Sequence, residues 1–286
     1  MAITISRQKT APTVFGAINC PRRVASANSG VKGLRAEMDG WRPKGPTMNP
    51  EPTPINAPAG DTFSTYMFTP PRGSLASRLP PLRSIFSARG ALVALGRAIV
   101  FESDLERKQA LVLLASGQTA DLIDQPTSLK FVGFGDKEFS HTFDFAWVLK
   151  DGRRAFVYSK PAEKVARRNL NALVERMNAQ LAPEVADGIL LMTDEDINPT
   201  AVFNAELMHA ARRCGNPVVE KLILSHCATQ AQPVSIGALV ALFGGGGLCF
   251  RPIIRLVAEG LLSADGKGRL GYGTLVAAAR CGERVK

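Results

Sequence analysis

Residues 101–160 decide the fold of this chain: they open with FESDLERKQALVLL (101–114) and close with TFDFAWVL (142–149) and AFVYSK (155–160). The first segment has the apolar spacing of an amphipathic helix, and the other two are rich in β-branched and aromatic residues, as strands are. The helix carries acidic residues, one strand holds a single aspartate, and the other ends in lysine. This combination predicts a site that cuts phosphodiesters with a divalent metal.

The predicted helix has a clear start at Ser103. A serine here caps the first turn, where Asp104 and Glu106 interact favourably with the helix dipole, and the spacing from Ser103 to Glu106 matches a capping box. Apolar residues at positions 105, 110, 111, 113 and 114 then supply the buried face. We therefore expect a helix whose first turn holds Glu106.

Three strands, a helix and a further strand are predicted after this first helix. The strands are 127–134, 141–149 and 153–159, with a tight hairpin at Lys150-Asp151-Gly152. An amphipathic helix follows over 163–182, and the continuous apolar run DGILLMTD (187–194) is expected to form a central strand. This order resembles the core of restriction-endonuclease-like α/β proteins, a mixed sheet flanked by helices.

The segments on either side of this core differ in composition. Twelve of the nineteen prolines fall within residues 1–81, and we expect 1–75 to be a disordered, basic tail. Residues 76–199 are predicted to form the endonuclease-like domain, entered through a short helix or strand within 79–101. A smaller helical domain with winged-helix character is expected over 200–286. There, helices within 218–228, 235–244 and the start of 250–278 precede a glycine-rich two-strand turn.

Charge is unevenly distributed along the chain, whose formal net charge is +10. Residues 1–71 carry eight Lys and Arg against four Asp and Glu, and 197–286 carry ten against five, whereas the middle is nearly balanced. Excess positive charge in the flanks favours a polyanionic partner such as nucleic acid. Simple solubility is the alternative explanation.

Other classes of protein are disfavoured by composition. The five cysteines are scattered without a CxxC pair, and with three histidines they offer no zinc-site spacing. No apolar run approaches the roughly 18–20 residues of a membrane span, and the N-terminus lacks the apolar core of a signal peptide. We expect a cytoplasmic protein with reduced thiols and no membrane partner.

Three residues are candidates for catalysis, although each has an ordinary alternative. Asp144 lies between Phe143 and Phe145, where a buried charge is costly without a metal or a partner; the alternative is an arginine partner. Lys160 ends its strand, where a solvated lysine is equally ordinary. Glu106 is, by default, a surface glutamate on a helix. Because the three residues follow one another on a helix and two successive strands, we predict that they form one site.

Several segments between residues 97 and 200 together resemble TnsA-like endonuclease subunits of heteromeric transposases. SDLE (103–106) is similar to the helix motif with the catalytic glutamate, and TFDF (142–145) with KDG (150–152) is similar to the strand and hairpin of the metal-binding aspartate. FVYSKPAEK (156–164) resembles the strand that ends in Lys-Pro. DLIDQPTSL (121–129) and TDEDINP (193–199) resemble the segments after the helix and after the last core strand.

The resemblance implies both an activity and partners. Glu106, Asp144 and Lys160 would be catalytic, with Glu106 and Asp144 binding Mg²⁺ or Mn²⁺ and Lys160 positioning water or stabilising the pentavalent phosphate. The subunit would cut the 5′ ends of a transposon in double-stranded DNA, while a separate transposase cuts and joins the 3′ ends. An AAA+ ATPase regulator would contact its C-terminal region. The setting would be the bacterial cytoplasm, at the nucleoid when active.

Basic residues in two regions are candidates for contacts with the DNA backbone. Those on the helix after the catalytic lysine are Arg167 and Arg168, for which a solvated face is the alternative. Those in the winged-helix-like domain are Arg251, Arg255, Lys267 and Arg269.

The sequence departs from the family at Tyr158, where the family carries Glu or Gln. A phenol is a poor ligand for magnesium at neutral pH. Three explanations are open: a nearby group (Glu163, Glu102 or the Val157 carbonyl) completes the site, Glu106 and Asp144 suffice with water, or the subunit is a catalytically impaired DNA-binding component of the complex. A winged-helix transcriptional regulator with an unrelated N-terminal domain is a further possibility.

Overall fold

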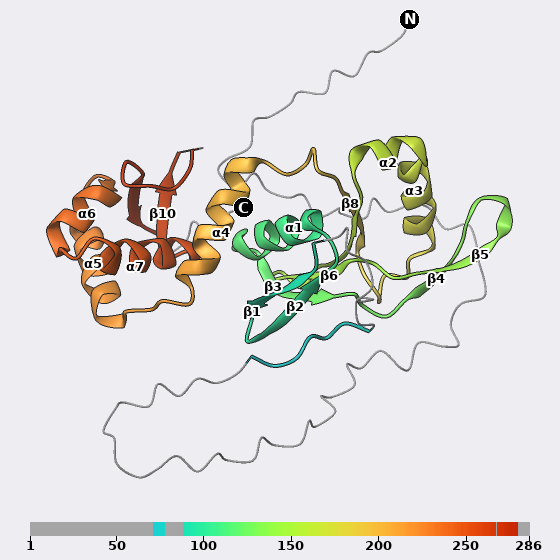
Figure 1. Cartoon of the computed structure of the whole chain (residues 1–286), viewed down its shortest axis with the longest axis horizontal. Helices are drawn as coiled ribbons and strands as arrows, with labels where there is room; N and C mark the ends of the chain where they lie inside the picture. Colours follow the sequence, from blue (N-terminus) through green and yellow to red (C-terminus); the bar gives the residue numbers. More distant parts are fainter. Residues whose placement is uncertain (1–70, 78–87, 267, 280–286) are drawn as a thin grey trace, which may run out of the picture. The chain divides into compact units, whose positions relative to one another are not determined.

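The computed structural model describes residues 71–77, 88–266 and 268–279 (Figure 1). The predicted tail over 1–75 therefore lies outside the described residues up to position 70, and so does Lys267. The described chain is a mixed α/β structure, which confirms the predicted class of fold.

A four-stranded mixed sheet forms the centre of the region that holds the candidate residues. Its strands, in spatial order, are β3 (Thr119–Asp124), β6 (Phe145–Leu149), β7 (Arg154–Ser159) and β8 (Gly188–Met192). Strand β6 runs antiparallel to both β3 and β7, whereas β8 runs parallel to β7. The tight turn predicted between β6 and β7 is confirmed, because Leu149 N donates to Arg153 O at 2.8 Å and Gly152 has a φ of 89°.

Helices cover both faces of this sheet. Helix α1 (Asp104–Ala115) packs through Ala110, Leu113 and Leu114 on the face that includes Phe145 and Trp147. The opposite face carries Ala146, Phe156 and Tyr158 and packs against α2 (Ala162–Arg167) and α3 (Leu170–Gln180). Alternation of side chains along β6 and β7 accounts for the two separate cores.

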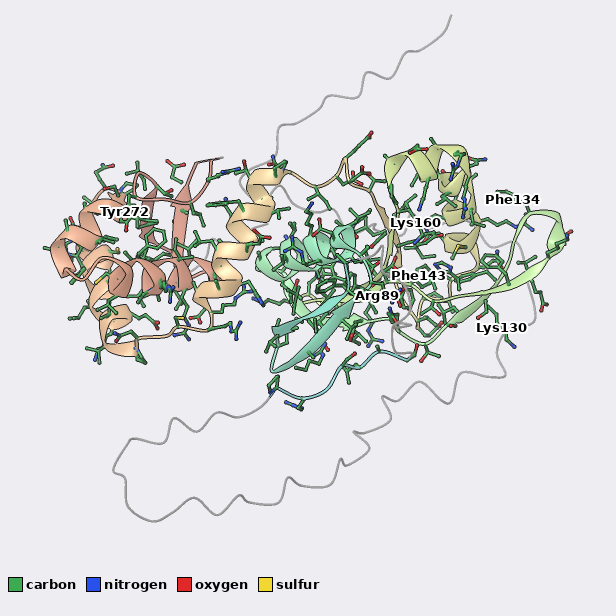
Figure 2. All side chains as sticks on the ribbon, in the orientation of Figure 1. Arg89, Lys130, Phe134, Phe143, Lys160 and Tyr272 are labelled. Carbon is green, nitrogen blue, oxygen red and sulfur yellow. The ribbon has the colours of Figure 1, made fainter. Side chains whose placement is uncertain are left out.

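Two strands were predicted in the wrong place in the sheet. The strand predicted within 127–134 is present, but it is not the first strand of the sheet; that strand is β3, over residues that were not predicted to form a strand. Residues Leu129–Val132 instead form β4, which pairs with β5 (Glu138–His141) in a separate two-stranded hairpin with Phe134 exposed at its turn (Figure 2). Strand β8 was expected to be central but lies at the end of the described sheet.

The helix predicted over 163–182 is divided into α2 and α3. Asn169, between them, has a φ of 49°, in the left-handed region that a continuous helix cannot include. Before α1, a hairpin of β1 (Gly90–Ala94) and β2 (Arg97–Phe101) occupies the segment predicted as transitional. Its turn has positive φ at Leu95 and Gly96, as a tight hairpin requires.

The C-terminal residues form a helical region with a small sheet. Its helices are α4 (Pro199–Ala211), α5 (Pro217–Thr229), α6 (Ile236–Phe243) and α7 (Gly247–Ala258), and its strands are β9 (Val234–Ser235), β10 (Leu262–Asp265) and β11 (Leu275–Ala278). The helices predicted in this region and its two-strand turn are confirmed. The turn's strands, β10 and β11, pair antiparallel, and β9 adds a third strand.

Helix α1 also belongs to the core of this C-terminal region. Leu111 and Ala115 pack with Ala205 and Met208 of α4. Arg212, just after α4, donates to the carbonyl oxygens of Leu114 and Ala258 at 3.1 Å each, near the C-terminal ends of α1 and α7. The predicted domain boundary at residue 199 is thus bridged by packing and hydrogen bonds.

No helix within the described ranges is long and apolar enough to cross a membrane. The cysteines in those ranges, Cys214, Cys227 and Cys249, are free thiols.

Candidate active site

Glu106 lies in the first turn of α1, in a variant of the predicted capping box in which its carboxylate accepts from the backbone N–H of Glu102, one residue before the cap. Ser103 Oγ accepts from Glu106 N at 3.2 Å and donates to Glu106 Oε1 at 2.9 Å, while Glu106 Oε2 accepts from Glu102 N at 2.7 Å. The side chain is buried, with 9% of its surface exposed, so it is not the solvated glutamate of the ordinary alternative. Each carboxylate oxygen keeps a lone pair for a further partner.

Asp144 lies immediately before β6, at an irregular point of the sheet. Its backbone N donates to Val157 O at 3.0 Å, and its Oδ2 accepts from Ser159 N at 2.7 Å. Only 17% of its side chain is exposed. The arginine partner of the ordinary alternative is not found among the described residues, where the cation nearest its carboxylate belongs to Lys160.

Lys160 directly follows β7 and is held on two sides. Its Nζ donates to Ser159 O at 2.8 Å and lies 4.5 Å from the centre of the Tyr158 ring. The same atom is 3.9 Å from Asp144 Oδ2. An ammonium group has three donors, so Lys160 keeps the capacity to contact an anionic ligand.

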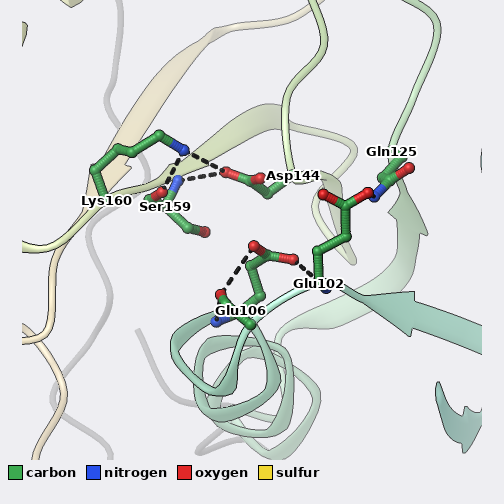
Figure 3. Close-up of polar contacts among 7 residues, drawn as sticks. Glu102, Glu106, Gln125, Asp144, Ser159 and Lys160 are labelled. Carbon is green, nitrogen blue, oxygen red and sulfur yellow. Dashed lines mark hydrogen bonds and ion pairs between the residues drawn. The ribbon is translucent and has the colours of Figure 1, made fainter. Parts of the chain in front are cut away.

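The structure therefore brings the three predicted catalytic residues to one place, from α1 and from the ends of β6 and β7. Figure 3 shows the carboxylates of Glu106 and Asp144 turned toward the same space, with Lys160 on the far side of Asp144. Burial raises the pKa of Glu106, and the charge of Asp144 raises it further. Burial also raises the pKa of Asp144, opposed mainly by the charge of Lys160.

Glu102 is a third carboxylate at this site. It lies between β2 and α1, and its negative charge contributes to the raised pKa of both Glu106 and Asp144. One of its oxygens accepts from Gln125 Nε2 at 2.8 Å, and the other points toward Asp144 in Figure 3. Of the other groups considered as ligands, Glu163 is 85% exposed and 4.0 Å from Arg167, and the Val157 carbonyl accepts the Asp144 N–H within the sheet.

The chemistry of these side chains suits a hard divalent cation. Carboxylate oxygens are the ligands that Mg²⁺ and Mn²⁺ prefer, and two of them with water are sufficient for Mg²⁺. The repulsion between buried carboxylates is what a bound cation would offset. No group of three His, Cys, Asp or Glu side chains in the described part of the chain is already arranged as a metal cluster. The residues that could hold a divalent cation are therefore Glu106 and Asp144, with Glu102 beside them.

Tyr158 takes no part in this group of acids. Its ring packs in the core beneath α2 and α3, edge-on to His141 and Phe143 at centroid distances of 4.5 and 6.3 Å. Burial raises the pKa of its phenol. The tyrosine at this position therefore serves in packing, and its phenol stays neutral.

The candidate DNA-binding residues differ in their surroundings. Arg167 and Arg168 are exposed on and after α2, and the charge of Arg168 reaches Tyr158. Arg251 is exposed on α7, and Arg269 lies over the Phe203 ring at 4.8 Å. Arg255 is instead paired with Glu220 at 2.8 Å and Glu259 at 2.9 Å, which accounts for it without DNA.

A neutral amide in place of Glu106 is expected to stabilise the metal-free fold. Because the pKa of Glu106 is raised, the folded chain binds this proton more tightly than the unfolded chain, so ionisation costs stability as pH rises through this range. Glu106→Gln should therefore melt at a higher temperature than wild type at pH 7 in EDTA, with the difference vanishing below about pH 4. Thermal unfolding across pH tests this, with exposed Glu175→Gln as the control; equal melting of Glu106→Gln and wild type at pH 7 would contradict it.

Comparison with known proteins does not assign this chain to a family. No protein-family model matches the sequence, and no match is found among curated proteins.

Proposed function

We propose that this chain is a divalent-metal-dependent DNA endonuclease, the TnsA-like subunit that cuts 5′ transposon ends beside a separate transposase. The observation that carries the proposal is the convergence of Glu106, Asp144 and Lys160, which come from three separate elements. The mixed sheet flanked by helices supports a restriction-endonuclease-like fold for this region, and α5, α6 and α7 with a small sheet support a winged-helix-like C-terminal region. The direct test is Mg²⁺- or Mn²⁺-dependent cleavage of DNA that carries the transposon ends.

In this proposal the acids hold the cation and the lysine acts on the phosphate. Glu106 and Asp144 supply carboxylate oxygens from opposite sides of the site, and the capping box fixes the rotamer of Glu106. A bound Mg²⁺ or Mn²⁺ supplies charge neutralisation at the phosphate and a more acidic water molecule. Lys160, anchored by Ser159 O and the Tyr158 ring, presents its remaining N–H groups to a phosphate oxygen or the attacking water.

The exposed basic side chains on and just after α2 are candidates to contact the DNA backbone away from this site. Lys164 and Arg168 are both exposed and lie four residues apart, which places them on one side of the helix that begins beside Lys160. Arg167 projects from a different position and faces Glu163 at 4.0 Å. We therefore assign phosphate contacts first to Lys164 and Arg168.

Removal of Arg168 should weaken DNA binding in a salt-dependent way. Each phosphate that the protein no longer neutralises reduces the slope of log K against log salt by about 0.9. Arg168→Ala should show this reduction in binding titrations at several salt concentrations, with an equal fall in affinity on any sequence. Arg153→Ala, in the hairpin at the other end of β7, is the control, and an unchanged slope for Arg168→Ala would remove this surface from the proposal.

A second function is favoured by Tyr158. The buried phenol stands where a metal ligand is expected, and under this second function the chain has an inactive nuclease fold and serves as a DNA-binding subunit for assembly. In that case Tyr158→Gln leaves cleavage absent, whereas a strong gain of cutting shows a sound scaffold that lacked one ligand. Genes for a transposase and an ATPase beside this one would support both functions against a transcriptional regulator.

A further inference from the structure

Gln125, which directly follows β3, has an unusual backbone conformation. Its φ is 39°, in the left-handed region that is unfavourable for residues other than glycine. It also precedes Pro126, and a residue in that position normally adopts an extended backbone. Only 3% of its surface is exposed. The chain thus holds a buried, polar side chain in a strained conformation beside the candidate active site.

Hydrogen bonds on each side fix this conformation. Gln125 N donates to Asp144 O at 3.0 Å, and Gln125 O accepts from Ser77 N at 2.9 Å. The neighbouring Asp124 is fully buried, and its Oδ2 accepts from Val100 N at 2.8 Å and from Ser74 Oγ. These contacts join the end of β3 to β2 and to the start of β6, so the strain is imposed by the surrounding structure.

The side chain of Gln125 contacts Glu102, one of the three carboxylates at the candidate active site. Its Nε2 donates to Glu102 Oε1 at 2.8 Å, and Figure 3 shows Glu102 held between Gln125 and Asp144. Its Oε1 is buried without a hydrogen-bond partner in the described structure. A residue serving only to fill space would avoid both the strain and the unpaired oxygen, because each costs stability.

We propose that Gln125 is a positioning residue, which orients the Glu102 carboxylate toward Glu106 and Asp144 for binding a divalent cation. Its backbone ties it to Asp144 and its amide ties it to Glu102, so it fixes the relative position of two of the three acids. Partners that orient a metal-binding carboxylate commonly change metal affinity by about 10–100-fold. This inference rests on the proposed nuclease function.

The test measures binding of Mn²⁺ to the full chain by calorimetry, together with thermal unfolding. Gln125→Gly removes the amide and relieves the strained backbone, whereas Gln125→Met removes the amide and keeps a side chain of similar length. Both should bind Mn²⁺ roughly 10–100-fold more weakly than wild type while remaining folded. Leu95→Gly is the matched control, because Leu95 also has a left-handed φ, of 54°, but lies in the β1–β2 turn.

The possible results separate this inference from the function on which it rests. Wild-type Mn²⁺ affinity in both Gln125 variants overturns the positioning role while leaving the nuclease proposal intact. A fall in Gln125→Gly alone assigns the effect to the backbone and also overturns it. If the wild-type chain binds no Mn²⁺ and cuts no DNA with its partner transposase, the proposed function itself fails.

Discussion

Asp144→Asn is expected to lower the rate of DNA cleavage by on the order of 10³-fold while the chain remains folded. Asparagine keeps the size of the side chain but removes the negative charge that would hold the cation opposite Glu106. The remaining acids, Glu106 and Glu102, do not replace it, because Asp144 is the carboxylate that adjoins Lys160, at 3.9 Å.

The fold should tolerate this change. Asparagine Oδ1 can accept the Ser159 N–H as Asp144 Oδ2 does now, at 2.7 Å. Since burial raises the pKa of Asp144, a neutral isostere also removes the cost of a buried charge. Lys160 keeps its hydrogen bond to Ser159 O. Loss of cleavage would therefore report on chemistry and not on unfolding.

The measurement is cleavage of a plasmid that carries the transposon ends of the proposed function, with the proposed partner transposase present and Mg²⁺ or Mn²⁺ added. Asp151→Asn is the matched control, because Asp151 is an exposed aspartate of the β6–β7 turn paired with Arg153. Thermal unfolding and DNA binding are measured for both variants. Cleavage by Asp144→Asn at the wild-type rate would remove Asp144 from the active site.

The sequence alone predicts the elements whose signals are local. Ser103 and Glu106 are three residues apart and form the capping box by themselves, and Lys150-Asp151-Gly152 turns the chain without help from distant residues. The strands that bring Asp144 and Lys160 together have uniform β-type composition. For these reasons the helix and strands that carry Glu106, Asp144 and Lys160 can be predicted without knowledge of their tertiary contacts.

Long-range contacts decide the features that the sequence does not reveal. Strand β3 contains Asp121 and Asp124, which make it look like a polar connection. In the structure Asp121 pairs with Arg97 of β2 at 2.5 Å, and Asp124 Oδ2 accepts from Val100 N of β2 and from Ser74 Oγ, so distant residues hold both carboxylates within the sheet. Conversely, 127–134 has strong strand composition but leaves the sheet to pair with β5, a choice made by tertiary packing.

Long-range contacts also decide features of the candidate active site that the sequence does not reveal. Glu102 and Gln125 are 23 residues apart, and their contact depends on where β2 and β3 end. Nothing in the sequence marks Gln125 as left-handed, since a glutamine before proline normally indicates an extended backbone. The acids on the predicted elements were thus identifiable, whereas the group that orients Glu102 was not.

Glu102→Gln is expected to reduce cleavage by about 10²-fold, whereas Tyr158→Phe should leave the rate within about twofold of wild type. The two changes test which residue serves as the third metal-binding side chain of the proposed site. Glu102 contributes a negative charge that both Glu106 and Asp144 experience. Tyr158 contributes a ring, packed against His141 and beneath Lys160, and phenylalanine retains that ring.

Cleavage rates and Mn²⁺ affinities of these two variants are compared under the conditions used for Asp144→Asn. A fall in both measurements for Glu102→Gln alone assigns the third carboxylate to the loop before α1, so that an acid four residues before Glu106 replaces one from the third strand. The reverse result, with Tyr158→Phe inactive and Glu102→Gln active, would require the phenol oxygen in the reaction. That outcome would contradict the assignment of Glu102, because cleavage would survive the loss of its charge. It is not expected, because burial raises the pKa of the Tyr158 phenol and keeps it protonated, without a charge with which to bind a cation.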